Sequence, residues 1–414
     1  MLILVIYIKA YCKRRKIVIE LLAPAGDLEK LKVAILYGAN AVYIGGKKFS
    51  LRARASNFSL EEIKEAVIFA HHHQAKVYIT MNIVPHNDDF DGLEDYLQTL
   101  DAYGVDGIIV TSLSIAQVAK EITPRLERHL STQFSASNSS TVNLFKSWGF
   151  SRVILAREVS LQQIKAIVEK TDLELEVFIH GGMCVSYSGR CMLSNHMTNR
   201  DANRGGCAHS CRWNYQLFDH NLPISEDQDF AMGSTDLCGL RAIPTLIDMG
   251  ISSLKIEGRM KSIHYIATVV RSYRMLIDEY YSTGTIKDFT IYEQEIAKAE
   301  NRTTGTGFLF HKPGIAEQVY NNNELFPTKE FIGTVLEYNQ ETGFVKVEQR
   351  NFFAVGDVLE IFGPNKAHFQ QKVLSLQDEL GNEITEAPHP LQIVYFQVSK
   401  PVESGDMIRR LTPK

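Results

Sequence analysis

The chain has 414 residues, of which 45% are hydrophobic and 22% are charged, and its formal net charge is −4. This is the composition of an ordinary soluble chain, long enough for one large domain and a smaller one. Nothing in it requires a membrane, so no membrane partner is expected.

The opening stretch, MLILVIYIKAYCKRRK, is the one segment that could suggest a membrane or export signal. Its apolar run of eight residues is too short to span a bilayer. Its basic residues follow the apolar run instead of preceding it, and no small-residue cleavage site appears. We therefore interpret residues 1–16 as an N-terminal extension and expect a cytoplasmic protein whose thiols stay reduced.

A repeating unit follows, in which an amphipathic helix ends at a glycine and a short apolar strand comes next. It occurs in LYGANAVYIGG, AYGVDGIIVT, SWGFSRVILAREV and DMGISSLKIEGR. The glycines suit the left-handed position that ends a helix, and the strands alternate little, as strands buried on both faces do. With VIELLAPAG, KVYITMN, RHLSTQFSA and LEVFIHGG, the pattern gives eight strands. It predicts a (β/α)8 TIM-like barrel over residues 17–285, with its site at the carboxyl ends of the strands.

A cysteine-rich insertion, residues 181–241, is expected where the seventh strand ends. Of the chain's six cysteines, all but Cys12 lie in this segment, namely Cys184, Cys191, Cys207, Cys211 and Cys238. In a reducing compartment, cysteines clustered among Gly, Ser, Asn and Arg favour a metal centre. The alternative, that these cysteines are simply small apolar residues of the core, is less favoured. Their spacing is uncommon for structural zinc, and an iron–sulfur cluster fits widely spread thiolates equally well. The residues alone leave iron and zinc open.

Positive charge gathers in the same segment. Four arginines face a single acidic residue, Asp201, and they are Arg190, Arg200, Arg204 and Arg212. In a slightly acidic chain this excess suggests a surface for phosphate, either of RNA or of a small anionic metabolite. The equally weighted alternative is that the arginines balance the charge of a metal cluster and pair with Asp201.

Three further side chains are candidates for catalysis at the barrel mouth. His180 ends the seventh strand, and Lys255 and Glu257 lie at the end of the eighth. They could orient a substrate, or they could be structural polar residues of the barrel end.

The pattern changes beyond the barrel. Residues 286–330 read as a polar connector, and residues 331–414 contain short strands and Gly-Asp turns that predict a small C-terminal β-barrel. This domain carries no catalytic constellation, so it is interpreted as an accessory domain, with an RNA-docking module as the alternative.

Several of these segments resemble motifs of the collagenase-like U-32 peptidase family. EVFIHGGMCVSYSGRCMLS is similar to its signature, and LLAPAG, NRGGCAHSCRW, STDLC and SLKIEGRMKS stand where the family has its other motifs. The resemblance runs from about Glu20 to the C-terminus. Gly182 departs from the pattern, which has Ser or Ala there, and the change removes only a small side chain.

The resemblance implies a function that the residues alone do not select. The branch of the family that this chain most resembles acts on tRNA and forms 5-hydroxyuridine at the wobble position in a prephenate-dependent way. It implies a 4Fe–4S cluster on Cys184, Cys191, Cys207 and Cys238, with Cys211 as the spare or alternate ligand and zinc as the alternative metal. The expected partners are tRNA, a small anionic metabolite such as prephenate, and a paralogous family member.

Two other classes of function remain open. A peptidase of the same family needs a nucleophile with a base or a metal-bound water, and the sequence contains no HExxH pair and no recognisable nucleophile elbow. A thiol peptidase built on Cys184 stays possible in sequence terms, because His180 lies four residues before it. A noncatalytic RNA-binding scaffold would need the arginines and not the cysteines.

Overall fold

A computed structural model describes residues 19–51, 57–224, 229–299, 302–320, 329–364 and 366–411. The predicted N-terminal extension, with Cys12, lies outside the described residues. No helix in these ranges combines the length and the apolar character needed to cross a membrane.

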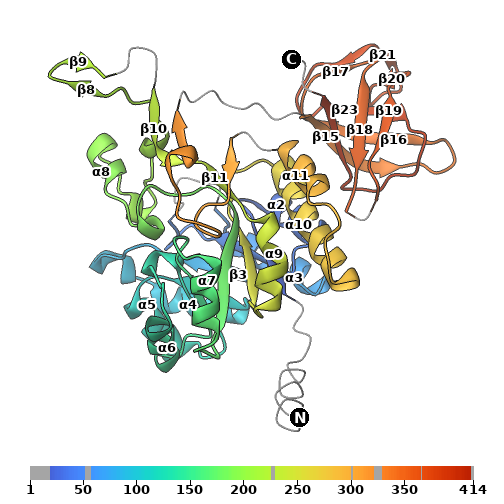
Figure 1. The fold of residues 1–414 in the computed structure, drawn as a ribbon. Coiled ribbons are helices and arrows are strands. Elements are labelled where there is room, and N and C mark those ends of the chain that lie inside the picture. The colour runs from blue at the N-terminus through green and yellow to red at the C-terminus, as the bar shows by residue number, and fades with distance from the viewer. Residues whose placement is uncertain are drawn as a thin grey trace, which may run out of the picture.

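The larger part of the chain is a closed parallel barrel surrounded by helices (Figure 1), which confirms the predicted fold. Its strands follow one another around the barrel, and β12 closes it by pairing with both β7 and β1. The strands are β1 (Glu20–Pro24), β2 (Ala41–Gly45), β3 (Lys76–Met81), β4 (Gly107–Val110), β5 (Glu127–Leu130), β6 (Arg152–Ile154), β7 (Glu174–Gly181) and β12 (Ser253–Ile256). The helices are α2 (Leu28–Leu36), α3 (Leu60–His72), α4 (Leu93–Ala102), α5 (Leu113–Ile122), α6 (Ser139–Ser147), α7 (Leu161–Val168), α9 (Ile243–Asp248) and α10 (Ile263–Thr283).

Local sequence signals set the limits of these helices. Asp27 begins α2 by accepting a hydrogen bond from the backbone N–H of Lys30 at 2.9 Å. The glycines that were predicted to end helices have positive φ values, for example 110° at Gly38 and 77° at Gly250. This conformation is costly for other residues, so the chain turns there toward the next strand.

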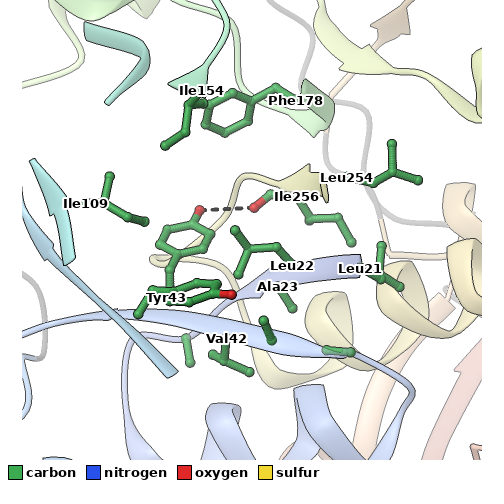
Figure 2. Close-up of a cluster of buried hydrophobic side chains, with 14 of the residues drawn as sticks. Leu21, Leu22, Ala23, Val42, Tyr43, Ile109, Ile154, Phe178, Leu254 and Ile256 are labelled. Atoms are coloured by element: carbon green, nitrogen blue, oxygen red, sulfur yellow. Dashed lines mark hydrogen bonds between the residues drawn. The ribbon is translucent and has the colours of Figure 1, made fainter. Parts of the chain in front are cut away.

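Apolar side chains fill the space between the strands and the helices. Figure 2 shows Leu21, Leu22, Val42 and Leu254 in this buried cluster. Tyr43 points to the opposite side of β2 from Val42, where it lines a cavity at the barrel end, and its hydroxyl donates a 3.0 Å hydrogen bond to the backbone carbonyl of Ile256. That bond joins β2 to the end of β12 and satisfies a hydroxyl group that burial would otherwise leave unpaired.

The barrel interior also contains a buried chain of charges. Lys255 on β12 lies 2.7 Å from Glu176 on β7, and Arg152 on β6 contacts Glu176 at 3.2 Å and Glu20 on β1 at 2.6 Å. Each of these charges has an opposite partner, which offsets the cost of removing it from water. The network connects strands across the barrel beneath its mouth.

The cysteine-rich insertion rises from the end of β7. It contains the short helix α8 (Leu193–Thr198), the projecting hairpin of β8 (Phe218–Asp219) and β9 (Leu222–Pro223), and the strands β10 (Phe230–Ser234) and β11 (Asp236–Cys238). β11 returns antiparallel to β7 at the barrel edge. Figure 1 shows the hairpin extending away from the barrel at the upper left.

The segment predicted as a connector contributes its own elements. α11 (Thr290–Ala297) packs on α10, β13 (Thr304–Gly305) pairs with β11, and β14 (Gln318–Tyr320) pairs with β10. These pairings anchor the cysteine-rich insertion from outside, so residues after the barrel help to shape its mouth.

The C-terminal domain is a curled antiparallel sheet of eight strands in the order β19-β18-β24-β15-β16-β23-β20-β21. They are β15 (Lys329–Tyr338), β16 (Phe344–Gln349), β18 (Val358–Phe362), β19 (Phe369–Lys372), β20 (Leu376–Gln377), β21 (Glu383–Ile384), β23 (Ile393–Gln397) and β24 (Met407–Leu411), with a separate pair of β17 (Phe353–Ala354) and β22 (Glu386–Ala387). Alternating apolar residues such as Val345 and Val347 form a core inside the curl. This is the expected small β-domain.

Buried charges join this domain to the barrel helices. Arg409 on β24 is fully buried and lies 2.7 Å from Glu295 on α11 and 2.6 Å from Glu360 on β18. Its guanidinium also lies over the ring of Phe362, 4.1 Å from the centroid. On the barrel side, Arg271 of α10 donates a 2.9 Å hydrogen bond to the carbonyl of Gly363. The two domains are therefore held by paired and desolvated groups instead of by a flexible tether.

Candidate functional site

A cavity of about 440 Å³ lies at the carboxyl ends of the barrel strands. Strand-end residues such as Thr80, Asn82 and Phe178 form its barrel side, and the cysteine-rich insertion forms its other wall. This is the end of a (β/α)8 barrel where functional sites are found. The combination makes the cavity the candidate site.

Four cysteine thiols belong to this cavity, and they are Cys184, Cys191, Cys207 and Cys211. All four are partly exposed, and no disulfide joins them. Burial raises the pKa of the Cys211 thiol, and the nearby Cys184 and Cys207 raise it further. The structure thus brings together thiols spread over twenty-eight positions of the sequence, from 184 to 211.

Cys238, which the resemblance assigns as the fourth ligand, is not part of the cavity wall. It ends β11 opposite His180 and packs against the barrel core. Within the described ranges, no three His, Cys, Asp or Glu side chains form a group close enough for one metal ion. The ligand assignment therefore stays a prediction, and the cavity wall offers Cys211 as the fourth thiol.

Side-chain hydrogen bonds fix the loops that carry the thiols. The amide of Asn203 donates to the carbonyl of Cys191 at 3.1 Å, and Arg200 donates to the carbonyl of Cys207 at 3.3 Å. The hydroxyl of Ser194 accepts a 3.0 Å hydrogen bond from the N–H of Ala208. These bonds fix the loop backbone on either side of α8 that carries Cys191 and Cys207.

The four predicted RNA-binding arginines have different surroundings. Arg212 lines the cavity, donates to the carbonyl of Met183 at 3.3 Å and lies 3.5 Å from Asp236. Arg190 is exposed, with its guanidinium 5.4 Å from the ring centroid of Phe134. These two arginines remain suited to contact a bound anion.

Arg204 and Arg200 are engaged within the protein. Arg204 forms a two-pronged contact with Asp89 of the β3–α4 connection, with one of its N–O distances at 3.1 Å. This ion pair ties the insertion to the barrel and holds the pKa of Asp89 below its usual value. Arg200 holds the Cys207 carbonyl, as described above. Half of the predicted cationic surface thus supports the loop structure.

Of the three predicted catalytic residues, two lie at the cavity and one does not. Lys255 and Glu257 line the cavity, whereas His180 is only 1% exposed and is not part of the wall. The hydroxyl of Tyr273 lies 3.3 Å from Nδ1 of His180. Burial lowers the pKa of Lys255, while the adjacent Glu176 opposes that shift. Glu257 accepts a 3.4 Å hydrogen bond from the N–H of Gly182, next to the cysteines.

The charged cavity residues that were not singled out from the sequence include Arg157, Arg259 and Asp236. Arg157 follows β6 and stacks on Phe178, 3.9 Å from the ring centroid, and its guanidinium donates to the carbonyl of Gly182. Arg259 donates to the hydroxyl of Ser50 at 2.9 Å. Asp236 is buried beside Arg212, and burial raises its pKa. Their position just after barrel strands, or on the strand that covers the mouth, was the signal that could have identified them.

Two segments of the chain, which correspond to the barrel part and the C-terminal domain, each match a known protein family. Residues 26–318 match peptidase family U32, and residues 327–409 match the peptidase family U32 C-terminal domain. The chain is 49% identical over 400 residues to the tRNA hydroxylation protein P1 of Bacillus subtilis, covering 94% of both chains.

Two more distant relatives carry different names. The 23S rRNA 5-hydroxycytidine C2501 synthase of Escherichia coli is 39% identical over 260 residues, which are 63% of this chain and 39% of that protein. A collagenase of Porphyromonas gingivalis is 29% identical over 409 residues, covering 94% of this chain and 97% of the relative. The match of the family model over most of the chain, together with the Bacillus relative, shows that this protein belongs to peptidase family U32.

Proposed function

We propose that this protein takes part in the hydroxylation of RNA, and that its substrate is a wobble uridine of tRNA that becomes 5-hydroxyuridine. The observation that carries the proposal is the cavity at the barrel mouth, which combines four thiols with several cationic side chains. Relatives named for tRNA hydroxylation and for rRNA hydroxycytidine synthesis support the RNA class of substrate.

The proposed cofactor is a 4Fe–4S cluster held by Cys184, Cys191, Cys207 and Cys211. The donor set fits, because a 4Fe–4S cluster takes four cysteine thiolates and these four line one cavity. Arg212 lies in the same wall and can balance part of the negative charge of bound thiolates. When bound, such a cluster supplies electron transfer. Zinc, the alternative metal, would need at least three of these thiols to lie closer together than they do in the described residues.

The proposed co-substrate is a small anionic metabolite, and prephenate is the candidate that the family resemblance suggests. Arg157, Arg259, Lys261 and Arg302 all line the cavity and offer cationic donors for carboxylate groups. The planar guanidinium of Arg157 is already oriented by its stacking on Phe178 and its bond to Gly182. Such fixed donors lower the cost of orienting an anion when it binds.

The floor of the cavity has a positioning role in this proposal. Lys255 is held from below by Glu176 and lies 4.4 Å from the ring centroid of Tyr43. Its ammonium group is therefore fixed at the strand end, where it can face a substrate oxygen. Glu257 holds the backbone of Gly182 and so connects the barrel floor to the cysteine loop.

The geometry does not support the peptidase arrangement that the sequence suggested, with Cys184 as the nucleophile and His180 as its base. A thiol peptidase on Cys184 would need an adjacent general base, and the Cys184 sulfur lies 3.0 Å from the hydroxyl of Ser186. His180 is buried against Tyr273 and is not part of the cavity wall. Because one relative is named a collagenase, the experiment must distinguish peptide cleavage from RNA modification.

Titration of tRNA against the anaerobically purified protein tests the proposal. We expect binding that weakens as salt rises, and Arg190→Ala should lower the log–log salt slope by roughly one unit if Arg190 contacts one phosphate. Arg125→Ala is the matched control, because Arg125 precedes β5 at the opposite end of the barrel and pairs with Asp101 at 2.7 Å. Absence of tRNA binding, together with gelatin cleavage that Cys184→Ser abolishes, would replace this proposal with the peptidase.

A further inference from the structure

Two exposed aromatic residues directly neighbour cavity residues in the sequence. Trp213 is 42% exposed and directly follows the cavity residue Arg212, and Tyr187 is 54% exposed and directly precedes the cavity residues Ser188 and Gly189. Both belong to the cysteine-rich insertion. They lie on separate loops, and each of these loops also contributes residues to the cavity wall.

Within the described ranges, neither ring stacks on another ring or on a cation. Among the described residues, Trp213 and Tyr187 take part in none of the aromatic pairs or cation–π contacts, unlike Trp148, which is exposed to a similar extent, 46%, but packs edge-on against Phe145. Met260, which lines the cavity, is 60% exposed. Exposed apolar groups that gather at one opening indicate a surface that binds something.

The charges of the neighbouring cavity wall point to the chemistry of the ligand. Arg212, Lys261 and Arg302 line the cavity, and Arg190 is exposed on the segment that follows Tyr187. Aromatic rings among cations are the features by which proteins hold single-stranded nucleic acid, because bases stack on the rings and phosphates contact the cations. An apolar peptide would use the rings and would gain less from the cations.

A folded RNA must also rearrange to reach this cavity. A base that reacts inside an enzyme pocket has to leave its stack, and the loss of stacking costs free energy. Aromatic rings at the entrance can restore part of that stacking for the neighbouring bases.

We propose that Trp213 and Tyr187 form a stacking platform for unpaired RNA bases at the entrance to the cavity. This inference deepens the proposed function, since it states that the substrate is recognised as a single-stranded loop and that the two rings position the nucleotides that flank the reacting one. They are positioning residues, because neither ring belongs to the cavity wall.

The chain has only two tryptophans, which makes the platform directly measurable. In a Trp148→Phe background the fluorescence comes from Trp213, and a uridine-containing single-stranded oligoribonucleotide should quench it, while the same sequence in a duplex should quench it much less. Trp213→Ala should raise the Kd for the single strand by about tenfold, and Trp213→Phe should restore much of the affinity. The salt slope should stay unchanged in Trp213→Ala, because no phosphate contact is lost. Tyr187→Ala, compared with Tyr187→Phe, repeats the comparison at the second ring.

The outcomes separate this inference from the proposed function. If the Trp213→Ala protein binds single strands as tightly as wild type and still supports 5-hydroxyuridine formation, the platform is refuted and the proposed function stands. If single-stranded RNA quenches Trp213 but no hydroxylated nucleoside depends on the protein, the platform stands and the proposed function fails. Quenching by gelatin peptides and not by RNA would overturn the platform.

Discussion

Replacing Cys211 with Ser is expected to remove most of the iron and acid-labile sulfide from the anaerobically purified protein, whereas Cys238→Ser should leave both in place. Wild type should contain about four atoms of each per chain. The reason is the position of the two thiols: Cys211 lines the same cavity as Cys184, Cys191 and Cys207, and Cys238 packs at the barrel edge. Iron and sulfide analysis with the visible absorption spectrum gives the readout.

Cys184→Ser and Cys12→Ser are the matched controls for this comparison. The first should lose the cluster and the second should keep it. If Cys238→Ser loses iron while Cys211→Ser retains it, the assignment implied by the family resemblance is correct and the cavity-based one is wrong. Stoichiometric zinc with no brown chromophore would reject iron altogether.

The second large effect is expected at the contact between the two domains. Arg409→Met should lower the free energy of unfolding by about 3 kcal/mol, because it leaves the carboxylates of Glu295 and Glu360 buried with less positive charge. Arg410→Met is the matched control on the next residue: Arg410 pairs with Glu330 and Asp357 closer to solvent, so we expect a loss of about 1 kcal/mol or less. Chemical denaturation with fluorescence and circular dichroism measures both, and equal effects would contradict this account.

The same contact predicts a dependence on pH. Although burial raises the pKa of Glu295, the charge of Arg409 and the bond from Lys298 lower it to about 2 in the folded protein. Because the folded pKa lies below the ordinary value, the carboxylate stabilises the fold above about pH 4, and this contribution is lost as pH falls toward 2. Arg409→Met should show a weaker decline over that window than wild type does.

The sequence predicted the barrel well because its information is local. Each strand is a short apolar run, and each helix stops at a residue such as Gly38 that favours a positive φ. These signals depend on neighbours within a few positions, so one sequence is enough to recognise them. The place of the cysteine insertion followed from the end of the seventh strand for the same reason.

The sequence could not predict which side chains face the cavity and which are engaged within the protein. These properties depend on contacts between segments that are far apart in the chain, and hydrophobic periodicity carries no information on such contacts. Arg204 was grouped with the RNA-binding arginines because its partner Asp89 lies 115 positions earlier in the chain. His180 was placed with the catalytic candidates, although the alternation of β7 and the packing of Tyr273 bury it away from the cavity. Likewise, β13 shapes the mouth through its pairing with β11, and nothing in the polar segment around Thr304 announced a strand.

The most direct test of the central claim is mass spectrometry of tRNA nucleosides from cells that lack this gene and any paralogue. We predict that 5-hydroxyuridine and its derivatives disappear, that wild type and the Trp148→Phe protein restore them, and that Cys184→Ser does not. An unchanged nucleoside profile in the deletion strain would contradict the claim that this cavity serves RNA hydroxylation.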